Sequence, residues 1–278
     1  MAPLAAFLVC WLLLSWLLRR GISLPMDHPN ERSLHVTPTP RIGGLGIMAG
    51  VGVASIWLAG TSPFPVALQA ALPVVLAAFA LAAVSVLDDV RGLPVALRFL
   101  AHFVAAVACL LALAAWLGDA PGLAALCAAI AAAALAFLRF NFPPARVFMG
   151  DAGSIPLGFM AATLGMVGAM QDVWPWLFPL LVFSPFIVDA SVTLIRRGLR
   201  GEKVWQAHRS HYYQRVVLLG ATHRQLALAA YALMLAAAAL AFALLLYLQY
   251  TAWLLILSAA IYFLLFLAID WRWCRFSK

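Results

Sequence analysis

Residues 225–249 read QLALAAYALMLAAAALAFALLLYLQ and contain no lysine, arginine, aspartate or glutamate. A run of about 17–25 apolar residues is long enough to cross a bilayer as an α-helix. We count nine such runs, and the expected spans are residues 2–18, 42–60, 66–87, 97–117, 121–138, 155–170, 174–195, 225–249 and 251–270. The whole chain is 66% hydrophobic and only 10% charged, a composition that excludes a soluble domain of this size. The sequence therefore predicts an all-α fold, a polytopic integral membrane bundle of about nine transmembrane helices in a single domain over residues 1–278.

The charged residues of the chain alternate between the two ends of these spans. All 18 lysines and arginines fall in the segments at every second helix end, namely 19–41, 88–98, 139–154, 196–224 and 272–278. The turns at the other ends carry only Asp119 and Asp172. Because lysine and arginine collect in cytoplasmic loops, these five segments are expected on the cytoplasmic face. The net charge of +8 is explained in the same way, and it does not indicate binding to nucleic acid.

Two adjacent acids, Asp88 and Asp89, end the third expected span at its cytoplasmic end. Carboxylates are unfavourable there, because they lie close to the hydrocarbon and to the negative end of the helix dipole. One interpretation is a pair of interfacial acids balanced by Arg91. The other is a ligand pair for Mg²⁺, which prefers hard oxygens and bridges to phosphates, or a base for a phosphate nucleophile.

A third acid, Asp151, stands in Gly150-Asp151-Ala152-Gly153-Ser154, just before the sixth span. It could simply cap the helix that follows. The flanking glycines favour a different interpretation, because they let backbone N–H groups approach an anion or a metal-bound phosphate. Asn141, followed by Phe142 and two prolines, provides a stiff, polar entry to this loop.

The segment 196–224 contains His208 and His211, three residues apart, so they share a face where the segment is helical. Zinc is not indicated, because no third ligand follows at a suitable spacing. Arg209 and Arg215 lie beside the histidines, and this combination favours a pyrophosphate.

Two further features point to the same cytoplasmic side. Arg41 precedes Gly43-Gly44, where a glycine pair lets the second span begin in close packing with a neighbour. Asp189 lies inside the seventh span, and an intramembrane acid is a functional candidate unless it bonds to a neighbouring helix.

Taken together these motifs resemble those of the polyprenyl-phosphate N-acetylhexosamine-1-phosphate transferases. The family includes enzymes that start O-antigen, enterobacterial common antigen and teichoic-acid linkage synthesis, and phospho-N-acetylmuramoyl-pentapeptide transferase is a more distant relative. The matching stretches, in family order, are Pro29 to His35, Pro40 to Gly44, Leu87 to Pro94, Asn141 to Ala145, Val147 to Ser154, Pro185 to Asp189 and His208 to Arg215. The forms at residues 141–145 and 208–215 look most like the O-antigen initiating branch.

The resemblance implies transfer of an N-acetylhexosamine 1-phosphate from a UDP-sugar to undecaprenyl phosphate, with release of UMP. It implies a multi-pass protein of the bacterial inner membrane whose active site faces the cytoplasm. The implied process is the biosynthesis of lipopolysaccharide or of another cell-wall glycan. The implied cofactor is Mg²⁺, with Mn²⁺ as an alternative, and the partners are the acceptor lipid, the UDP-N-acetylhexosamine and the bilayer. A homodimer is compatible with the resemblance.

The resemblance also implies roles for individual residues. Asp151, Asp88 and Asp89 are expected to hold the metal, and the acid pair to orient or deprotonate the lipid phosphate. With His208 these acids form the expected catalytic set. The expected substrate-binding residues are Arg41, Asn141, Arg209, His211 and Arg215.

One family motif is missing from the chain. Relatives carry an Asn-rich, Asp-Gly-rich block between the acid pair and the Gly-Asp-Ala-Gly-Ser loop, where this chain has only Trp116 to Gly122 and an Ala-rich helix. Relatives of this branch have about eleven helices, so an even number has been lost and the orientation downstream is preserved. An alternative function is therefore a shortened, catalytically impaired homologue that binds nucleotide sugar or lipid. A transporter or flippase would need polar residues at mid-membrane depth, and few are present.

Overall fold

A computed structural model of the chain describes residues 1–20, 25–27, 37–61, 74–83, 85, 115, 118–206, 208 and 210–276. Apart from two very short strands, the regular elements of this described part are helical. Six of its helices are long and apolar enough to cross a membrane. The all-α membrane fold is thereby confirmed, whereas the count of nine spans is not. The chain divides into an N-terminal unit, Met1–Pro175, and a C-terminal unit, Trp176–Lys278, so the single domain stays a prediction.

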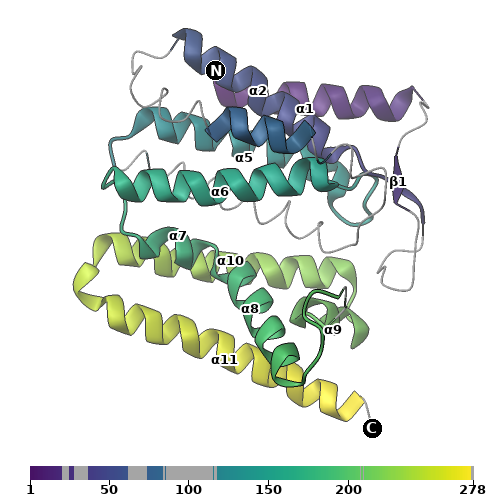
Figure 1. The fold of residues 1–278 in the computed structure, drawn as a ribbon, viewed down its shortest axis with the longest axis vertical. Coiled ribbons are helices and arrows are strands. Elements are labelled where there is room, and N and C mark those ends of the chain that lie inside the picture. The colour runs from purple at the N-terminus through teal and green to yellow at the C-terminus, as the bar shows by residue number, and fades with distance from the viewer. Residues whose placement is uncertain are drawn as a thin grey trace. The chain divides into compact units, whose positions relative to one another are not determined.

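Four long helices build the N-terminal unit: α1 (Ala2–Arg19), α2 (Gly43–Thr61), α5 (Pro121–Asn141) and α6 (Asp151–Met170). Proline stands in the first turn of α1 and of α5, where its missing N–H has no helical partner to lose. Helices α1, α2 and α5 pack against one another, and α6 packs on α2 (Figure 1). Two short strands, β1 (Met26–Asp27) and β2 (Thr39–Pro40), pair antiparallel at the entry to α2.

Close approach between α1 and α2 depends on glycines of α2. A Cβ at Gly46 would lie 2.6 Å from Leu14 Cγ, and one at Gly50 would lie 2.5 Å from the Ala6 carbonyl oxygen. Small residues of this kind let membrane helices pack backbone to backbone. The order of the contacts also shows that α1 and α2 run in opposite directions.

The helix ends that carry arginine lie together at one side of the N-terminal unit. Arg19 at the end of α1 lines the same hollow as Arg139, in the last turn of α5, and Arg146, in the loop after α5. Residues 40–44 hydrogen-bond to residues 148 and 149 at that end too. The expected shared side for segments 19–41 and 139–154 is therefore confirmed within this unit. Segment 88–98 and most of the spans 66–87 and 97–117 lie outside the described residues, apart from a helix over 74–83.

The C-terminal unit begins where one transmembrane helix was expected over 174–195, and that expectation is wrong. The chain there forms two helices, α7 (Leu177–Val182) and α8 (Ser184–Leu199), which Figure 1 shows as separate pieces with a bend between them. Pro185 supplies the physical reason, because it lacks the N–H that a continuous helix would bond to the Leu181 carbonyl, and its ring crowds that carbonyl. Helix α8 is amphipathic, with exposed apolar residues such as Ile187 and Ile195 and a basic last turn.

The remaining elements of this unit are α9 (Tyr212–Leu218), α10 (His223–Leu246), the 3₁₀ turn η1 (Leu248–Tyr250) and α11 (Thr251–Phe276). Thr222 caps α10, since its hydroxyl accepts a hydrogen bond from the Gln225 backbone N–H at 3.2 Å. The hydroxyls of Ser184 and Tyr262, 2.7 Å apart, join α8 to α11. Tyr212 stacks on Phe266 with ring centroids 3.9 Å apart, which fixes α9 on α11.

Candidate functional site

Backbone hydrogen bonds join two of the sequence motifs in the N-terminal unit. The Phe148 N–H donates to the Pro40 carbonyl at 2.8 Å. In return, the N–H groups of Gly43 and Gly44 donate to the carbonyls of Phe148 and Met149 at 2.9 and 2.7 Å. The loop before α6 is therefore pinned to the start of α2, although about a hundred residues of sequence lie between them.

Glycines make this junction possible. A Cβ at Gly44 would lie 2.2 Å from the backbone nitrogen of Gly153, and a Cβ at Gly153 would lie 2.7 Å from Gly44 Cα. No side chain fits in either place, so the first turns of α2 and α6 touch directly through their backbones. The close packing expected from Gly43-Gly44 is observed, and its partner is the Gly-Asp-Ala-Gly-Ser loop.

Asn141 fastens the same loop from the other side. This residue is almost fully buried at the end of α5, and its side-chain Nδ2 donates to the Val147 carbonyl at 2.8 Å. The amide therefore holds the loop in shape. A contact between Asn141 and the substrate stays a prediction.

Asp151 is the first residue of α6 and is 5% exposed. It does not act as the helix cap, because Gly150, with a φ of 69°, holds that position. A positive φ favours glycine there. The Ser154 hydroxyl lies 3.4 Å from Asp151 Oδ1, and the helix dipole favours a negative charge at this end. The structure thus presents a buried carboxylate, a hard oxygen donor of the kind that Mg²⁺ takes, at a rigid backbone junction.

Asp88 and Asp89 lie outside the described residues, so their convergence with Asp151 stays a prediction. Within the part of the chain that the structure describes, no three His, Cys, Asp or Glu side chains stand close enough to hold a metal. Asp151 would therefore need further ligands from elsewhere, from substrate phosphates or from water, as is usual for Mg²⁺.

Arg41 was predicted as a substrate-binding residue, and the structure shows its guanidinium paired with Asp27. The two side chains are only 3% and 4% exposed, and Arg41 Nη2 donates to Asp27 Oδ1. Removing either partner of a buried pair leaves an uncompensated charge, which is strongly destabilising. This partner could not be predicted from the sequence, because Asp27 stands in a polar loop among several other charges.

In the C-terminal unit, His208 lies beside Ser210 and His211. Ser210 Oγ lies 2.9 Å from His208 Nδ1, and the Ser210 backbone N–H also approaches that nitrogen, at 3.4 Å. Nδ1 is then an acceptor, which leaves the proton on Nε2. Partial burial lowers the pKa of His208 below its ordinary value, and the charges of Arg197 and His211 lower it further. His208 is therefore neutral at pH 7 and can donate one hydrogen bond from Nε2.

Asp189 organises the residues next to it. Its Oδ2 lies 3.1 Å from His211 Nδ1, and its Oδ1 accepts the Tyr212 backbone N–H at 2.8 Å. Of the two interpretations of this acid, bonding to a neighbouring element is the one observed. Asp189 holds the start of α9, and with it the orientation of the His211 ring.

Arg215 was predicted to bind substrate, and that role stays a prediction, while two of its three nitrogens donate within the protein. Nε donates to the Ser210 carbonyl at 3.0 Å, and Nη1 donates to Asp270 Oδ1 at 2.9 Å. Asp270 Oδ2 also accepts from Arg196 Nη1 at 2.6 Å and from the Tyr212 hydroxyl at 3.1 Å. This one carboxylate therefore ties α8, α9 and α11 together. Sequence analysis missed it, although an acid near the end of an apolar helix was a usable signal.

A second arginine, Arg197, holds the loop before the histidines. It is buried, and its Nε donates to Glu202 Oε2 at 2.7 Å. Its Nη2 donates to the Lys203 carbonyl at 3.0 Å, and Nη1 to the Gln206 carbonyl at 3.2 Å. Arg209 lies outside the described residues, so its predicted role is untested.

If the histidine segment binds a UDP-sugar, as the resemblance implies, Asp270→Asn is expected to weaken that binding roughly tenfold, or about 1.4 kcal/mol. The amide leaves Arg196 and Arg215 without their counter-charge, so the bonds that hold α9 and the His211 ring in place weaken. Binding of UDP-N-acetylglucosamine by calorimetry measures the effect. Asp119→Asn, at an exposed turn of the other unit, is the control. Equal affinities for Asp270→Asn and the wild type would show that the cluster does not position the histidines.

Comparison with known proteins agrees with the motifs. Residues 106–169 match the model of glycosyl transferase family 4. A probable undecaprenyl-phosphate N-acetylglucosaminyl 1-phosphate transferase of Bacillus subtilis is 33% identical over 104 residues, which are 37% of this chain and 29% of the relative. A phospho-N-acetylmuramoyl-pentapeptide-transferase of Desulforapulum autotrophicum is 34% identical over 91 residues, which are 31% of this chain and 24% of the relative.

A longer match shows how the chain differs from its relatives. The decaprenyl-phosphate N-acetylglucosaminephosphotransferase of Mycobacterium tuberculosis is 25% identical over 291 residues, covering 73% of this chain and 72% of the relative. The aligned stretch is longer than the whole 278-residue chain, yet it takes in only part of it. The relative therefore has residues inside this stretch with no counterpart here, in agreement with an internal shortening. By its motifs and by these matches, the chain is similar to the polyprenyl-phosphate N-acetylhexosamine-1-phosphate transferases, although it spans less than a third of the length of the Bacillus relative.

Proposed function

We propose that the chain transfers an N-acetylhexosamine 1-phosphate from a UDP-sugar to a polyprenyl phosphate, undecaprenyl phosphate in bacteria that use it. An oxygen of the lipid phosphate attacks the β-phosphorus of the nucleotide sugar, the bond to the bridging oxygen breaks, and UMP leaves. The product is the first lipid-linked sugar of a surface glycan such as O-antigen. The proposed location is the inner membrane, with the motif loops at the cytoplasmic side.

The observation that supports this proposal most strongly is the buried Asp151 at the junction of α2 and α6. When bound, Mg²⁺ would offset the charge that develops on the phosphates, and the Asp151 carboxylate would be one of its ligands. Because backbone bonds and glycine contacts fix the loop, the carboxylate needs no reorganisation before the reaction. Asp88 and Asp89 are proposed to orient or deprotonate the lipid phosphate.

The histidine segment is proposed to bind the diphosphate. Neutral His208 would donate from Nε2 to a phosphate oxygen, and His211, held by Asp189, would lie beside it. Arg209 is proposed to contribute charge. Arg215 acts instead by holding α9 and the Ser210 carbonyl in place.

The internal shortening favours a second candidate, a protein that binds nucleotide sugar or lipid with little turnover. Residues that act as a unit in catalysis depend on one another, so their effects on the rate are not additive. Loss of the Asn/Asp-Gly block is therefore expected to lower the rate by orders of magnitude. We therefore expect at best a weak transferase.

Release of UMP tests both candidates. Purified protein is given undecaprenyl phosphate, Mg²⁺ and UDP-N-acetylglucosamine or a related UDP-sugar. Turnover that requires both substrates supports the transferase. A rate near 1 s⁻¹, at the lower end of typical enzyme rates, would show that the missing block is dispensable. Mg²⁺-dependent binding of a UDP-sugar without any UMP release would establish the second candidate instead.

The pH dependence of binding follows from the lowered pKa of His208. Above its pKa the ring is neutral, and below it the ring gains a positive charge that attracts the diphosphate. Affinity for UDP-N-acetylglucosamine is therefore expected to stay constant from pH 8 to the ordinary histidine value of about 6.5, and to rise several-fold below it. Calorimetry at each pH measures this, and His208→Gln should remove the rise. A rise centred above pH 6.5 would contradict the predicted neutral state.

A further inference from the structure

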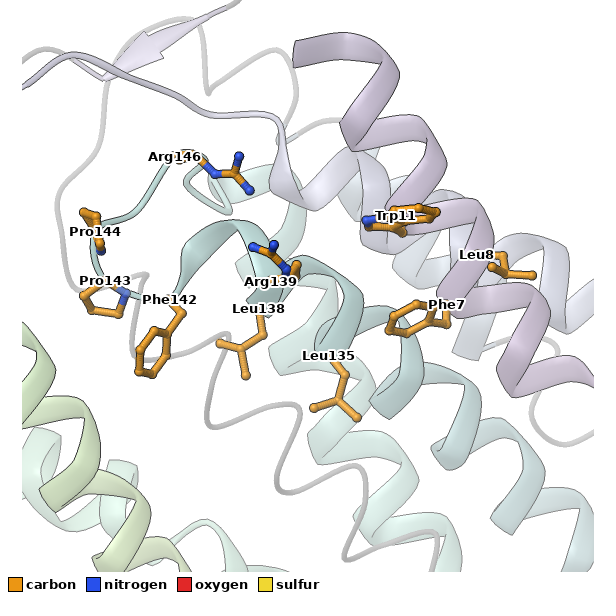
Figure 2. A pocket seen from close by; sticks show the side chains of 10 residues that line it. All are labelled: Phe7, Leu8, Trp11, Leu135, Leu138, Arg139, Phe142, Pro143, Pro144 and Arg146. Atoms are coloured by element: carbon orange, nitrogen blue, oxygen red, sulfur yellow. The ribbon is translucent and has the colours of Figure 1, made fainter. Parts of the chain in front are cut away.

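A groove runs between α1 and α5 in the N-terminal unit. Its walls are apolar: Phe7 and Trp11 come from α1, and Leu135 and Leu138 from α5 (Figure 2). The volume is about 920 Å³, in the range of ordinary ligand pockets, and the groove is open to the surroundings. Trp11 and Leu135 are 41% and 45% exposed on helices apolar enough to span a membrane, so lipid chains would face this groove.

Arginines gather at one end of this groove. Arg139, from the last turn of α5, and Arg146, from the loop that follows, line it (Figure 2). A second hollow of about 260 Å³ shares Trp11 and both arginines with the groove, and it adds Arg19 from the end of α1. Among the described residues, no carboxylate lies within ion-pair distance of these three guanidinium groups. The apolar walls thus lead to a cluster of three exposed cations at the basic side of the unit.

We propose that this groove binds an anionic glycerophospholipid of the surrounding bilayer, with its acyl chains along Phe7, Trp11 and Leu135 and its phosphate at Arg139, Arg146 and Arg19. Basic pockets between transmembrane helices on the cytoplasmic side are suited to such head groups. Arginine in particular offers paired donors that match phosphate oxygens. The side chains that line the two hollows in the described chain include no carboxylate and no histidine. None of the described lining residues could bind Mg²⁺ or accept a proton from a bound phosphate, and this favours a bilayer lipid over the acceptor substrate as the occupant.

The site has a structural consequence for the neighbouring loop. Arg146 stands one residue before Val147, whose carbonyl Asn141 holds, and five residues before Asp151. A lipid phosphate bound by Arg139 and Arg146 joins the end of α5 to this loop. The bound lipid therefore braces the segment that positions Asp151, without taking part in the reaction.

Native mass spectrometry of the full chain in detergent tests the proposal. Phosphatidylglycerol, phosphatidylcholine and undecaprenyl phosphate are titrated separately, and the retained one-to-one adducts are measured. The Arg139→Gln/Arg146→Gln double variant is expected to bind phosphatidylglycerol roughly 10- to 30-fold more weakly than the wild type, because two phosphate-binding charges are lost. The control Arg224→Gln/Arg272→Gln removes two exposed arginines of the other unit and should bind as the wild type does.

A second variant tests the apolar wall without changing charge. Leu135→Trp fills the groove and should reduce the phosphatidylglycerol adduct, while circular dichroism shows an unchanged helix content. Three outcomes would overturn the proposal: equal retention of phosphatidylcholine, unchanged binding by the arginine double variant, or preferential retention of undecaprenyl phosphate in this groove. The measurement involves no UDP-sugar and no turnover, so its result is independent of the proposed transferase activity.

Discussion

Asp151→Asn is expected to lower UMP release by a factor on the order of 10³, with the fold intact. The substitution keeps the size of the side chain but removes the negative charge that would hold a divalent cation at the start of α6. Because backbone bonds to residues 40–44 fix the loop, the neutral amide stays where the carboxylate was and cannot supply that charge. Initial rates at saturating Mg²⁺ and UDP-sugar, expressed relative to the wild type, measure the loss.

The matched control is Asp172→Asn. Asp172 stands in the turn after the opposite end of α6 and has a φ of 56°, which asparagine tolerates as well as aspartate does. This control should retain the wild-type rate. If Asp151→Asn lost less than about tenfold, the carboxylate would not be a ligand of the catalytic ion, and the proposed metal role would be wrong.

The second large effect is expected from Gly44→Ala and Gly153→Ala. In each variant the new methyl group meets backbone atoms of the facing helix, which no side-chain rotation can relieve. We expect each change to destabilise the protein by about 3 kcal/mol and to lower the melting temperature by roughly 6–12 °C. Thermal unfolding in detergent, followed by tryptophan fluorescence, measures the shift.

Each of these variants has a control within its own helix. Gly60 in α2 and Gly158 in α6 have no heavy atom within 4 Å of the position of an added Cβ. Alanine at either position is expected to be neutral or slightly stabilising, since alanine has the higher helix propensity. Melting temperatures for Gly44→Ala and Gly153→Ala that match their controls would show that α2 and α6 do not touch through these glycines.

The sequence predicted the membrane helices well wherever hydropathy alone decides them. Helices α1, α2, α5, α6, α10 and α11 all coincide with expected spans. The seventh expected span failed because hydropathy averages over the chain, while the break depends on the backbone N–H that Pro185 lacks. The alternation of charge also predicted which segments share an end of the N-terminal unit, because that rule needs no knowledge of contacts.

Partners of the charged residues could not be predicted in the same way. Arg41 and Arg215 were predicted to bind substrate, but their bonds to Asp27 and Asp270 depend on how helices pack, which one sequence does not show. The acceptor in a membrane bundle can lie anywhere along the chain, as the sequence separation of 55 between Arg215 and Asp270 illustrates. The pair Gly43-Gly44, in contrast, correctly predicted a close approach of the second span to a neighbour, although it did not identify the neighbour.

The backbone pairing of residues 40–44 with 148 and 149 bears on how this architecture can change its length during evolution. The two ends of the intervening stretch are held to each other directly, by peptide hydrogen bonds and by the contact of Gly44 with Gly153. Neither attachment passes through the residues in between. Helices can therefore be inserted or removed in pairs within that stretch while the junction that carries Asp151 keeps its geometry. Such a junction lets a chain shorter than its relatives preserve the framework of the site even where it has lost part of the site's chemistry.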